Sequence, residues 1–323
     1  MPSVSVIMNV RNGASTLREA LESVLAQSFH DWELIVWDDR SADESARIIV
    51  EYNDSRIRYF LSPEETSLGK ARGDAIRQAT GEWLAFLDQD DIWLPRKLEK
   101  QMALADDRTG LIYGRTVRFY PSGLERDYDQ THEFTLLPEG DIFNQLFADS
   151  CFIAMSSAVF RRAAVEAIGG IPDAIQIIPD YWLYVAVARR YPVRAVQGVV
   201  CRYRMHAANM SRLAAVKMNQ EVLWLIDQWA DHLSPRTLAL CRKRHFTAIA
   251  LREMRKPATA ARGVARLFRQ GSVGSQLVRP FMFAFHIIRR NVWRPYWRSF
   301  GYGSDLETAA RPDNARPPGP ANK

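Results

Sequence analysis

The first hundred residues alternate short β-rich apolar runs with segments of helical periodicity, and this alternation constrains the fold more than any other feature of the chain. Four apolar runs, at residues 4–8, 34–37, 57–61 and 83–87, are expected to form strands. Strands that alternate with helices are typical of βαβ units, in which the strands lie parallel in one sheet. The sequence therefore predicts an α/β fold with a mostly parallel sheet flanked by helices.

Aspartates follow two of these predicted strands directly. The run DQDD at residues 88–91 comes after the fourth strand, and Asp38 and Asp39 end the second. An open α/β sheet binds its ligand at the carboxyl ends of its strands. Neighbouring carboxylates repel one another, and a divalent cation shared with a diphosphate would relieve that repulsion. We therefore expect a metal and diphosphate site; the alternative is a solvated acidic turn that caps the helix after Pro95.

Composition limits the classes of protein to which this chain can belong. The chain has 323 residues, of which 47% are hydrophobic and 25% charged, as in a globular protein with a large core. Its three cysteines are far apart and show no CxxC spacing, so neither a disulfide framework nor a zinc site is predicted. No leader pattern and no long apolar stretch is found, so we expect a cytoplasmic protein.

The second half of the chain predicts further elements with different spacing. Residues 110–152 favour short antiparallel strands and loops, and Ala195 to Tyr203 favours another strand. Helices are expected at the following residues: 180–190, 216–232, 235–254 and 280–291. In the first half, capping-box patterns at Thr16 and Ser41 predict the N-termini of two helices.

The order of several motifs resembles that of family 2 glycosyltransferases. These motifs are VSVIMNVRNG, SVLAQSFHDWELIVWDDRSAD, KARGDA, GEWLAFLDQDDIWLPRKLEKQ and YRMHAANMS. The resemblance covers roughly residues 3 to 212. It implies a GT-A fold, which is Rossmann-like, and transfer of a sugar from a nucleotide-diphospho-sugar with inversion of the anomeric centre.

The resemblance also implies roles for the acidic run. Asp88 and Asp90 correspond to the DxD element, in which the first Asp lies toward the ribose and the second reaches the Mg²⁺ or Mn²⁺ that bridges the diphosphate; both are candidate metal ligands. Asp91 would be a supporting carboxylate. Arg72, in the KARG element, would be the basic residue next to the nucleotide.

Residues at the ends of the first two strands would bind the nucleotide. Asp39 resembles the residue that reads the nucleobase, with Asp38 as its neighbour, and a UDP- or dTDP-linked donor is expected. Asn9 and Arg11 belong to the first-strand motif, which departs from the SVIIPTYN of many members. In particular, Arg11 replaces an aromatic residue that often packs near the base.

Inverting transfer needs a base that takes the proton of the acceptor hydroxyl. By resemblance, the helix that begins PDYWL supplies Asp180 as this base, and Asp173 is a weaker second candidate. Alternatively, Asp180 is only the N-cap of that helix. His206, in the motif YRMH, would approach the metal or the diphosphate; the alternative is a hydrogen-bonded histidine with no ligand role.

The basic residues concentrate in the C-terminal quarter. Residues 241–323 hold 17 Lys and Arg against 4 Asp and Glu, whereas residues 1–240 hold 26 against 33. Aromatic residues and arginines together at 281–302 suit an anionic membrane surface, although they could equally pack on the catalytic domain. Residues 305–323, rich in Pro and polar residues, are expected to be disordered.

We therefore divide the chain into a catalytic domain at 1–212, a helical basic region at 213–304 and a tail at 305–323. Within the first, residues 1–105 would bind the nucleotide and 106–212 the acceptor. The expected function is a metal-dependent glycosyltransferase of bacterial surface polysaccharide or glycolipid synthesis, which acts on a glycan or lipid-linked acceptor at the inner face of the membrane. The alternative is a non-catalytic protein that binds nucleotide sugars or glycans. Binding of nucleic acid is not expected, because the tail lacks a groove-reading motif.

Overall fold

The computed structural model describes residues 1–120, 125–126, 135–149, 151–206, 209 and 214–254. Residues 1–252 form one compact unit, and the strands all belong to it. The strands are β1 (Val4–Val10), β2 (Trp32–Asp38), β3 (Ile57–Leu61), β4 (Trp83–Phe86), β5 (Ile92–Trp93), β6 (Leu111–Phe119), β7 (Glu125–Arg126), β8 (Val159–Arg161) and β9 (Val193–Arg204). The α-helices are α1 (Leu17–Leu25), α2 (Ser45–Val50), α3 (Leu68–Arg77), α4 (Lys97–Met102), α5 (Phe143–Ala148), α6 (Arg162–Ala167), α7 (Pro179–Ala188), α9 (Ala215–Gln228) and α10 (Pro235–Met254).

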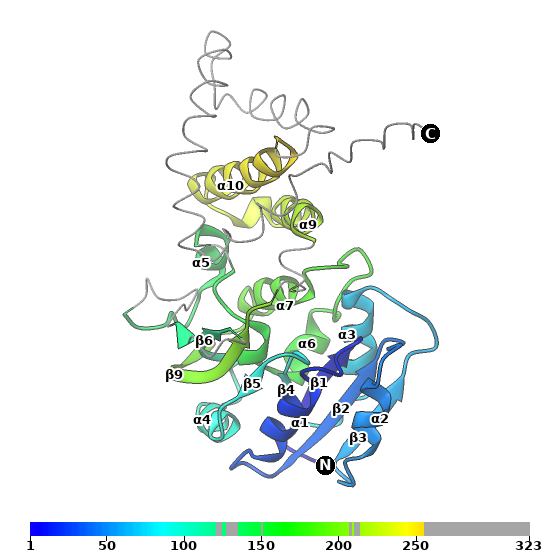
Figure 1. Cartoon of the computed structure of the whole chain (residues 1–323). Coiled ribbons are helices and arrows are strands. Elements are labelled where there is room, and N and C mark those ends of the chain that lie inside the picture. Colours follow the sequence, from blue (N-terminus) through cyan, green and yellow to red (C-terminus); the bar gives the residue numbers. More distant parts are fainter. Residues whose placement is uncertain (121–124, 127–134, 150, 207–208, 210–213, 255–323) are drawn as a thin grey trace, which may run out of the picture. The chain divides into compact units, whose positions relative to one another are not determined.

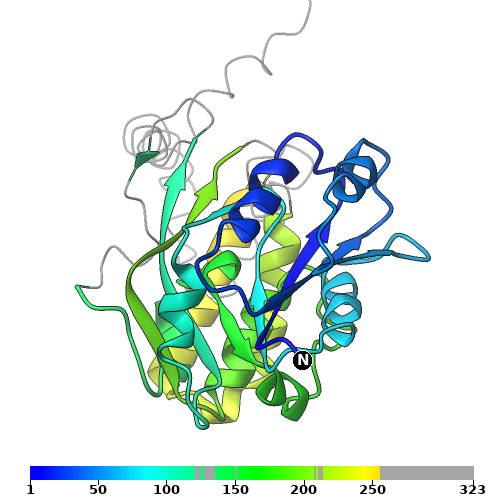
Figure 2. The same ribbon diagram turned by 90° about the horizontal axis from the view of Figure 1, so that it is seen from below.

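The strands form one mixed sheet in the order β3-β2-β1-β4-β8-β6-β9-β5, with β7 paired to β6. The first four strands along the chain are parallel to one another, as the βαβ pattern predicted. β8 inserts antiparallel between β4 and β6, whereas β6 and β9 pair in parallel over a long stretch. Figure 2 shows β1 and β2 toward one side of this sheet and β6 and β9 toward the other.

Helices cover both faces of the sheet because the side chains of a strand alternate between its faces. On β1, Val6 and Met8 join one core with apolar residues of α1, α2 and α4, while Ile7 joins a second core with residues of α3 and α7. Figure 1 shows the same division, with α3, α6 and α7 on the opposite side of the strands from α1 and α4. The strands β1, β2 and β4 are therefore buried on both faces, whereas β3 at the sheet edge is partly exposed.

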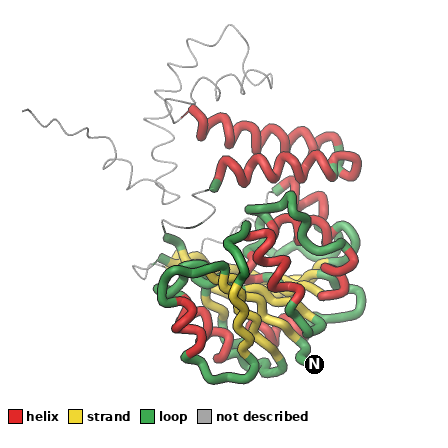
Figure 3. The backbone as a smooth tube through the Cα atoms, turned by 90° about the vertical axis from the view of Figure 1, so that its right-hand side faces the viewer, coloured by secondary structure: helices red, strands yellow, loops and turns green. Residues whose placement is uncertain are grey.

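Helices α9 and α10 lie side by side next to the α7 layer (Figure 3). His245 Nδ1 of α10 lies 2.8 Å from Asn219 Oδ1 of α9, and the Cys241 thiol donates to the Phe147 carbonyl at the end of α5. Leu225 of α9 is fully buried in the same core as α7. Within the described residues, no helix is both long and apolar enough to cross a membrane.

Neither predicted capping box forms, although Thr16 is the N-cap residue of α1 as predicted. The Thr16 hydroxyl donates to the Gly13 carbonyl and does not accept a hydrogen bond from the first turn of α1. Helix α2 begins later than predicted, with Glu44 as its N-cap residue. Ser41 Oγ instead accepts the Asn12 N–H at 3.0 Å, so its hydroxyl connects two loops across the sheet edge. Tertiary hydrogen bonds have replaced the local ones that the pattern suggested.

Candidate active site

The loops that follow β1, β2, β4 and β9 meet at one edge of the sheet. Val10 is paired with Asp38 across β1 and β2, and Ile7 with Phe86 across β1 and β4, so these strands end close together. β9 runs in the same direction, because two antiparallel pairings separate β4 from β6 and β9 is parallel to β6. This carboxyl edge is where open α/β sheets bind ligands.

Arg72 holds Asp88 at this edge. Arg72 lies on α3, and its side chain is only 4% exposed, while that of Asp88 is 34% exposed. The Arg72 guanidinium forms an ion pair with Asp88 Oδ1. A guanidinium buried this deeply needs a charged partner, and the carboxylate supplies it while keeping part of its surface open to a ligand. The structure therefore brings the predicted basic residue to the first Asp of the DxD element.

Asp90 meets His206 on the same edge. His206 Nε2 lies 2.7 Å from Asp90 Oδ2, and both side chains remain partly exposed. Arg204 Nε donates to the Asp90 carbonyl at 2.8 Å and so fixes the backbone of the loop. Burial and the charge of Asp88 raise the pKa of Asp90, and the contact with His206 opposes this rise. A protonated imidazole or a cation beside Asp90 would stabilise its ionised carboxylate.

Ser156 organises the loop from beneath, and sequence reasoning missed it. The Ser156 hydroxyl donates to Asp91 Oδ2 and accepts the Asp88 N–H at 3.1 Å. Asp91 also accepts the Arg204 N–H at 2.9 Å and is 1% exposed, which agrees with its expected supporting role. Burial raises the pKa of Asp91 well above its usual range, and the charges of Asp90 and Asp88 add to this. A lone serine in a short 3₁₀ turn gives no sequence signal for such a contact.

Asp180, which lies on α7, is near Arg72 and Asp88. It lies in the first turn of the helix, after Pro179, and Ile178 is the N-cap residue, so the reading of Asp180 as the N-cap is wrong. Burial raises the pKa of Asp180, the positive charge of Arg72 lowers it, and the charge of Asp88 raises it again. These two influences show that Asp180 shares the electrostatic surroundings of Arg72 and the DxD loop. Asp173, by contrast, is exposed.

Asp38 and Asp39 are buried and already hydrogen-bonded. Asp38 accepts the Ser41 N–H at 2.8 Å and the Tyr59 hydroxyl at 2.9 Å. Burial and the hydrogen bond to Asp38 raise the pKa of Tyr59 to about 12. Asp39 accepts the N–H and the hydroxyl of Thr66, at 3.0 and 3.1 Å. Both aspartates thus lie at the edge where they were expected, and each also ties neighbouring loops together.

The loop after β1 is joined to the DxD loop by Gln89. Its side-chain amide accepts the Arg11 N–H at 2.8 Å and donates to the Arg11 carbonyl at 3.0 Å, a contact that the sequence did not reveal. The Arg11 guanidinium reaches Glu65 at 2.5 Å and Asp39 at 3.6 Å. Asn9 Nδ2 is buried without a hydrogen-bond partner among the described residues. Arg11 is 44% exposed and could turn toward a ligand.

Asp90 and His206 are the residues that best fit a divalent cation. Their oxygen and nitrogen are adjacent, and the raised pKa of Asp90 marks a carboxylate that another positive charge would stabilise. In the described part of the chain, no group of three or more His, Cys, Asp or Glu residues is placed to hold a metal. Mg²⁺ commonly takes one or two carboxylates and completes its shell with substrate phosphates and water. The donor set suits a cation that binds together with a diphosphate.

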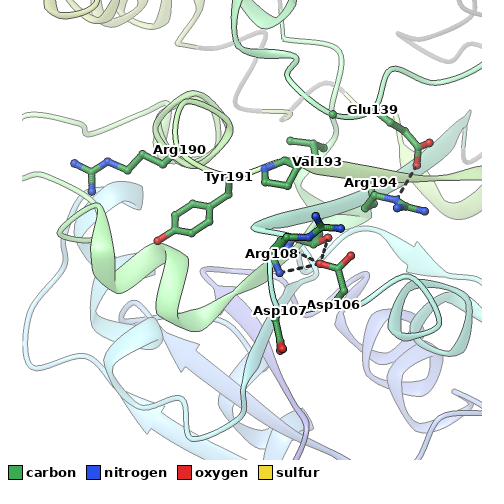
Figure 4. Close-up of a pocket in the computed structure, with 11 residues that line it drawn as sticks. Asp106, Asp107, Arg108, Glu139, Arg190, Tyr191, Val193 and Arg194 are labelled. Carbon is green, nitrogen blue, oxygen red and sulfur yellow. Dashed lines mark hydrogen bonds and ion pairs between the residues drawn. The ribbon is translucent and has the colours of Figure 1, made fainter.

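A separate surface hollow of about 760 Å³ lies at the other edge of the sheet, where β6 and β9 begin (Figure 4). Among its charged groups, Arg194 Nε lies 3.5 Å from Glu139, and Asp106 accepts the backbone N–H of Arg108 at 2.9 Å. Because ligands of such sheets bind at the carboxyl edge, we do not include this hollow in the candidate site.

Comparison with known proteins decides the family. The sequence model described as Glycosyl transferase family 2 matches residues 5–169, more than half of the chain. The chain belongs to glycosyl transferase family 2. The family that the motifs predicted is confirmed, and the protein is a glycosyltransferase by this membership. The match ends before α7, so Asp180 and His206 lie beyond it.

Three similar proteins extend this comparison. Escherichia coli WfgD, a UDP-Glc:alpha-D-GlcNAc-diphosphoundecaprenol beta-1,3-glucosyltransferase, is 28% identical over 213 residues, which are 64% of this chain and 79% of WfgD. The structure of S. aureus TarS 1-349 in complex with UDP-GlcNAc has a TM-score of 0.56 at 18% identity, covering 90% of this chain and 76% of that one. Mannosyltransferase PcManGT from Pyrobaculum calidifontis, in complex with GDP-Man and Mn²⁺, has a TM-score of 0.58 at 19% identity, covering 93% and 84%. These structures confirm the predicted α/β GT-A fold.

Proposed function

We propose that this glycosyltransferase moves a sugar from a nucleotide-diphospho-sugar to an acceptor hydroxyl and inverts the anomeric centre. One arrangement carries the proposal: the buried Arg72 guanidinium pairs with Asp88 from the loop after β4, and the charge of Asp180 from α7, like that of Asp88, raises the pKa of Arg72. Two carboxylates from distant parts of the sequence thus lie near one guanidinium at the ligand-binding edge. In one transfer, Asp180 can take the proton of the acceptor hydroxyl while Asp88 lies beside the donor.

In the proposed reaction, the acceptor oxygen attacks the anomeric carbon as its proton passes to an Asp180 carboxylate oxygen. A bond forms between the acceptor oxygen and the anomeric carbon. The bond from that carbon to the diphosphate oxygen breaks, and the nucleoside diphosphate leaves with the electron pair. Burial raises the pKa of Asp180, which makes its carboxylate a stronger base, while Arg72 limits the rise. The Asp180 carboxylate therefore has a higher proton affinity than an exposed aspartate has.

We infer that Asp90 and His206 would hold Mg²⁺ or Mn²⁺, with Asp88 beside the ribose. When bound, the cation would stabilise the charge of the departing diphosphate. Arg204 and Ser156 fix the backbone of the loop, so Asp88 and Asp90 present their oxygens without a large loss of conformational entropy. Arg72 would add a second positive charge near the nucleotide.

The nucleotide itself would lie against the loops after β1 and β2. We propose that Asp39 accepts a hydrogen bond from the base of a UDP- or dTDP-linked donor, with Asp38 holding the loop behind it. Arg11 would exchange its contact with Asp39 for one with the ligand, since its guanidinium is 44% exposed. Asn9 Nδ2, which is buried and has no hydrogen-bond partner within the described residues, would be a further donor at the end of β1.

The proposed acceptor is a glycan or a lipid-linked sugar of bacterial surface polysaccharide or glycolipid synthesis, because WfgD is named for an acceptor linked to diphosphoundecaprenol.

We propose that residues 1–105 bind the nucleotide and that 106–212 face the acceptor. The enzyme would work in the cytoplasm at the inner face of the cell membrane. The aromatic and basic residues at 281–302, which would contact that membrane, lie outside the described residues.

Release of nucleoside diphosphate tests the proposal. UDP-glucose, UDP-GlcNAc and GDP-mannose are each incubated with the protein and Mn²⁺, and hydrolysis of at least one, with water as the acceptor, is expected. Asp90→Ala should abolish this turnover, whereas Asp107→Ala, which changes a fully exposed aspartate near the other edge, should not. Donors that raise the melting temperature but are never consumed would favour the non-catalytic binding protein instead.

A further inference from the structure

We propose that Glu221 of α9 is a positioning residue for Asp180, so that the helices appended to the family fold set the rate of transfer. This inference rests on the proposed function, since it assigns Asp180 the role of base. It adds a residue that neither the family match, which ends at 169, nor the motifs of the sequence include.

The N-terminus of α7 depends on an acceptor from outside the helix. Pro179 occupies the first turn and has no N–H, the N-cap residue Ile178 offers no side-chain acceptor, and Asp180 Oδ1 accepts the Tyr181 N–H at 2.8 Å, so the amides of residues 177 and 178 need an acceptor from elsewhere. The N–H groups of Ile177 and Ile178 both donate to Glu221 Oε2, at 2.8 and 3.2 Å. The negative charge of Glu221 also suits the positive end of the helix dipole. Asp180 follows two residues after the amide of Ile178.

A second contact strengthens this attachment. Lys217, one turn before Glu221 on α9, donates to Gln176 Oε1 at 2.7 Å. On the other side of the same segment, the Gly69 N–H of α3 donates to the Gln176 carbonyl at 3.1 Å. Residues 175–178 are therefore held between α9 and α3.

The contacts of residues 175–178 connect the helix that carries Arg72 with the helix that carries Glu221. α3 carries Arg72 and binds the segment 175–178 through Gly69, while α9 binds the same segment through Glu221 and Lys217. A shift of α9 would move Asp180 relative to Arg72 without altering the DxD loop.

The test compares three variants of the full chain with the wild type: Glu221→Ala, Glu221→Gln and the control Asp227→Ala. Asp227 lies on the same helix, is exposed and pairs with Arg242 at 2.6 Å. UDP release from UDP-glucose and UDP-GlcNAc, and GDP release from GDP-mannose, are measured with Mn²⁺ to give kcat and donor KM. Amide hydrogen exchange of residues 175–182 is measured on the same proteins.

We expect Glu221→Ala to lower kcat by about 100-fold, the size of loss that a small misplacement of a catalytic group produces. Its donor KM should stay within about twofold, because the donor loops are unchanged. Glu221→Gln keeps an acceptor oxygen and should restore most of kcat, and Asp227→Ala should match the wild type. Exchange at 175–182 should be about tenfold faster in Glu221→Ala alone.

Two results would overturn the inference: an unchanged kcat in Glu221→Ala, or a parallel loss of kcat, donor affinity and melting temperature in both Glu221 variants. If the wild type consumes none of the three donors, the proposed function fails. In that case the exchange comparison still decides whether Glu221 holds the start of α7, and equal exchange in all four proteins would refute it.

Discussion

At the scale of single residues, Ser156 shows how a neutral side chain can hold an acidic loop in shape. Its hydroxyl donates to Asp91 and accepts the Asp88 N–H, and its carbonyl accepts the Trp93 indole N–H at 2.7 Å. Without the hydroxyl, the fully buried Asp91 would lose one of its two hydrogen bonds, and the Asp88 N–H would lose its acceptor. Buried polar groups that lose a partner are costly.

Ser156→Ala should therefore lower the free energy of unfolding by about 1–3 kcal/mol and reduce donor turnover more than this loss of stability explains. The matched control is Ser157→Ala, because Ser157 is equally buried and, among the described residues, its hydroxyl donates only to the Ala154 carbonyl. Chemical denaturation and nucleoside diphosphate release measure the two effects. Equal turnover in the two variants would show that Ser156 has no special part in the loop.

Arg72 allows a prediction about pH with a definite sign. The positive charge of Arg72 lowers the pKa of Asp180 against the effect of burial, so removing it should raise that pKa. The base works only as a carboxylate, so kcat of the wild type should rise with pH through the pKa of Asp180. In Arg72→Gln this rise should move to higher pH, which a kcat profile between pH 4 and 9 would detect. A rise that stays in place or moves to lower pH would contradict the pairing.

Other residues at the edge separate what the sequence could predict from what it could not. Asp38, Asp39 and Asp88 were predicted at strand ends, and a period-two strand pattern is enough to place them there. Gln89 and Glu221 were missed, because their partners are backbone amides of segments far away in the sequence. No local pattern encodes which backbone group a long polar side chain will meet.

At the scale of elements, the parallel strands were predicted closely. β3 matches its predicted bounds at Ile57–Leu61, β1 and β2 extend one or two residues further, and α10 matches at Pro235–Met254. The insertion of β8 between β4 and β6 was not predicted. β8 has three residues, of which only Val159 and Phe160 are apolar, and this pattern is too short to predict a strand. Strand order also depends on which edges remain free once the helices have packed.

The close approach of α3 to the segment before α7 yields a further prediction. A Cβ atom at Gly69 would lie 1.8 Å from the Ile175 carbonyl oxygen, so Gly69→Ala must force the two segments apart. A Cβ at Gly73 on the same helix would lie no nearer than 3.7 Å to the end of the Arg77 side chain.

We expect Gly69→Ala to destabilise the protein by about 3 kcal/mol or more, at the upper end of overpacking effects. Gly73→Ala should stabilise it by up to about 1 kcal/mol, because alanine favours a helix more than glycine does. Thermal unfolding of both variants measures this difference. Equal melting temperatures would contradict the close packing that brings Arg72 and Asp180 together.

At the scale of the whole molecule, charge divides the chain into two parts. The positive charge lies after residue 240, and residues 1–240 are net negative. An acidic catalytic region would be repelled by an anionic membrane, whereas the basic and aromatic residues of the C-terminal quarter would be attracted to it. The expected helix at 280–291 and the tail at 305–323 lie outside the described residues.

Flotation with anionic liposomes tests the proposed membrane contact. The full chain should float, and a chain cut after residue 275 should not, because it lacks the aromatic and arginine residues at 281–302. Added salt should weaken flotation of the full chain, since the attraction is partly electrostatic. Equal flotation of both chains would contradict the contact.

The most direct test of the central proposal, that Asp180 and the DxD loop act on one donor and one acceptor, is turnover in Asp180→Asn beside Asp173→Asn. Asp173 is the exposed second candidate for the base. With Mn²⁺ and the donor that the wild type consumes fastest among UDP-glucose, UDP-GlcNAc and GDP-mannose, Asp180→Asn should lose about 10²- to 10⁴-fold in kcat. It should keep the rise in melting temperature that this donor causes, and Asp173→Asn should behave as the wild type. Full turnover in Asp180→Asn, or loss of turnover in Asp173→Asn alone, would contradict the assignment of the base.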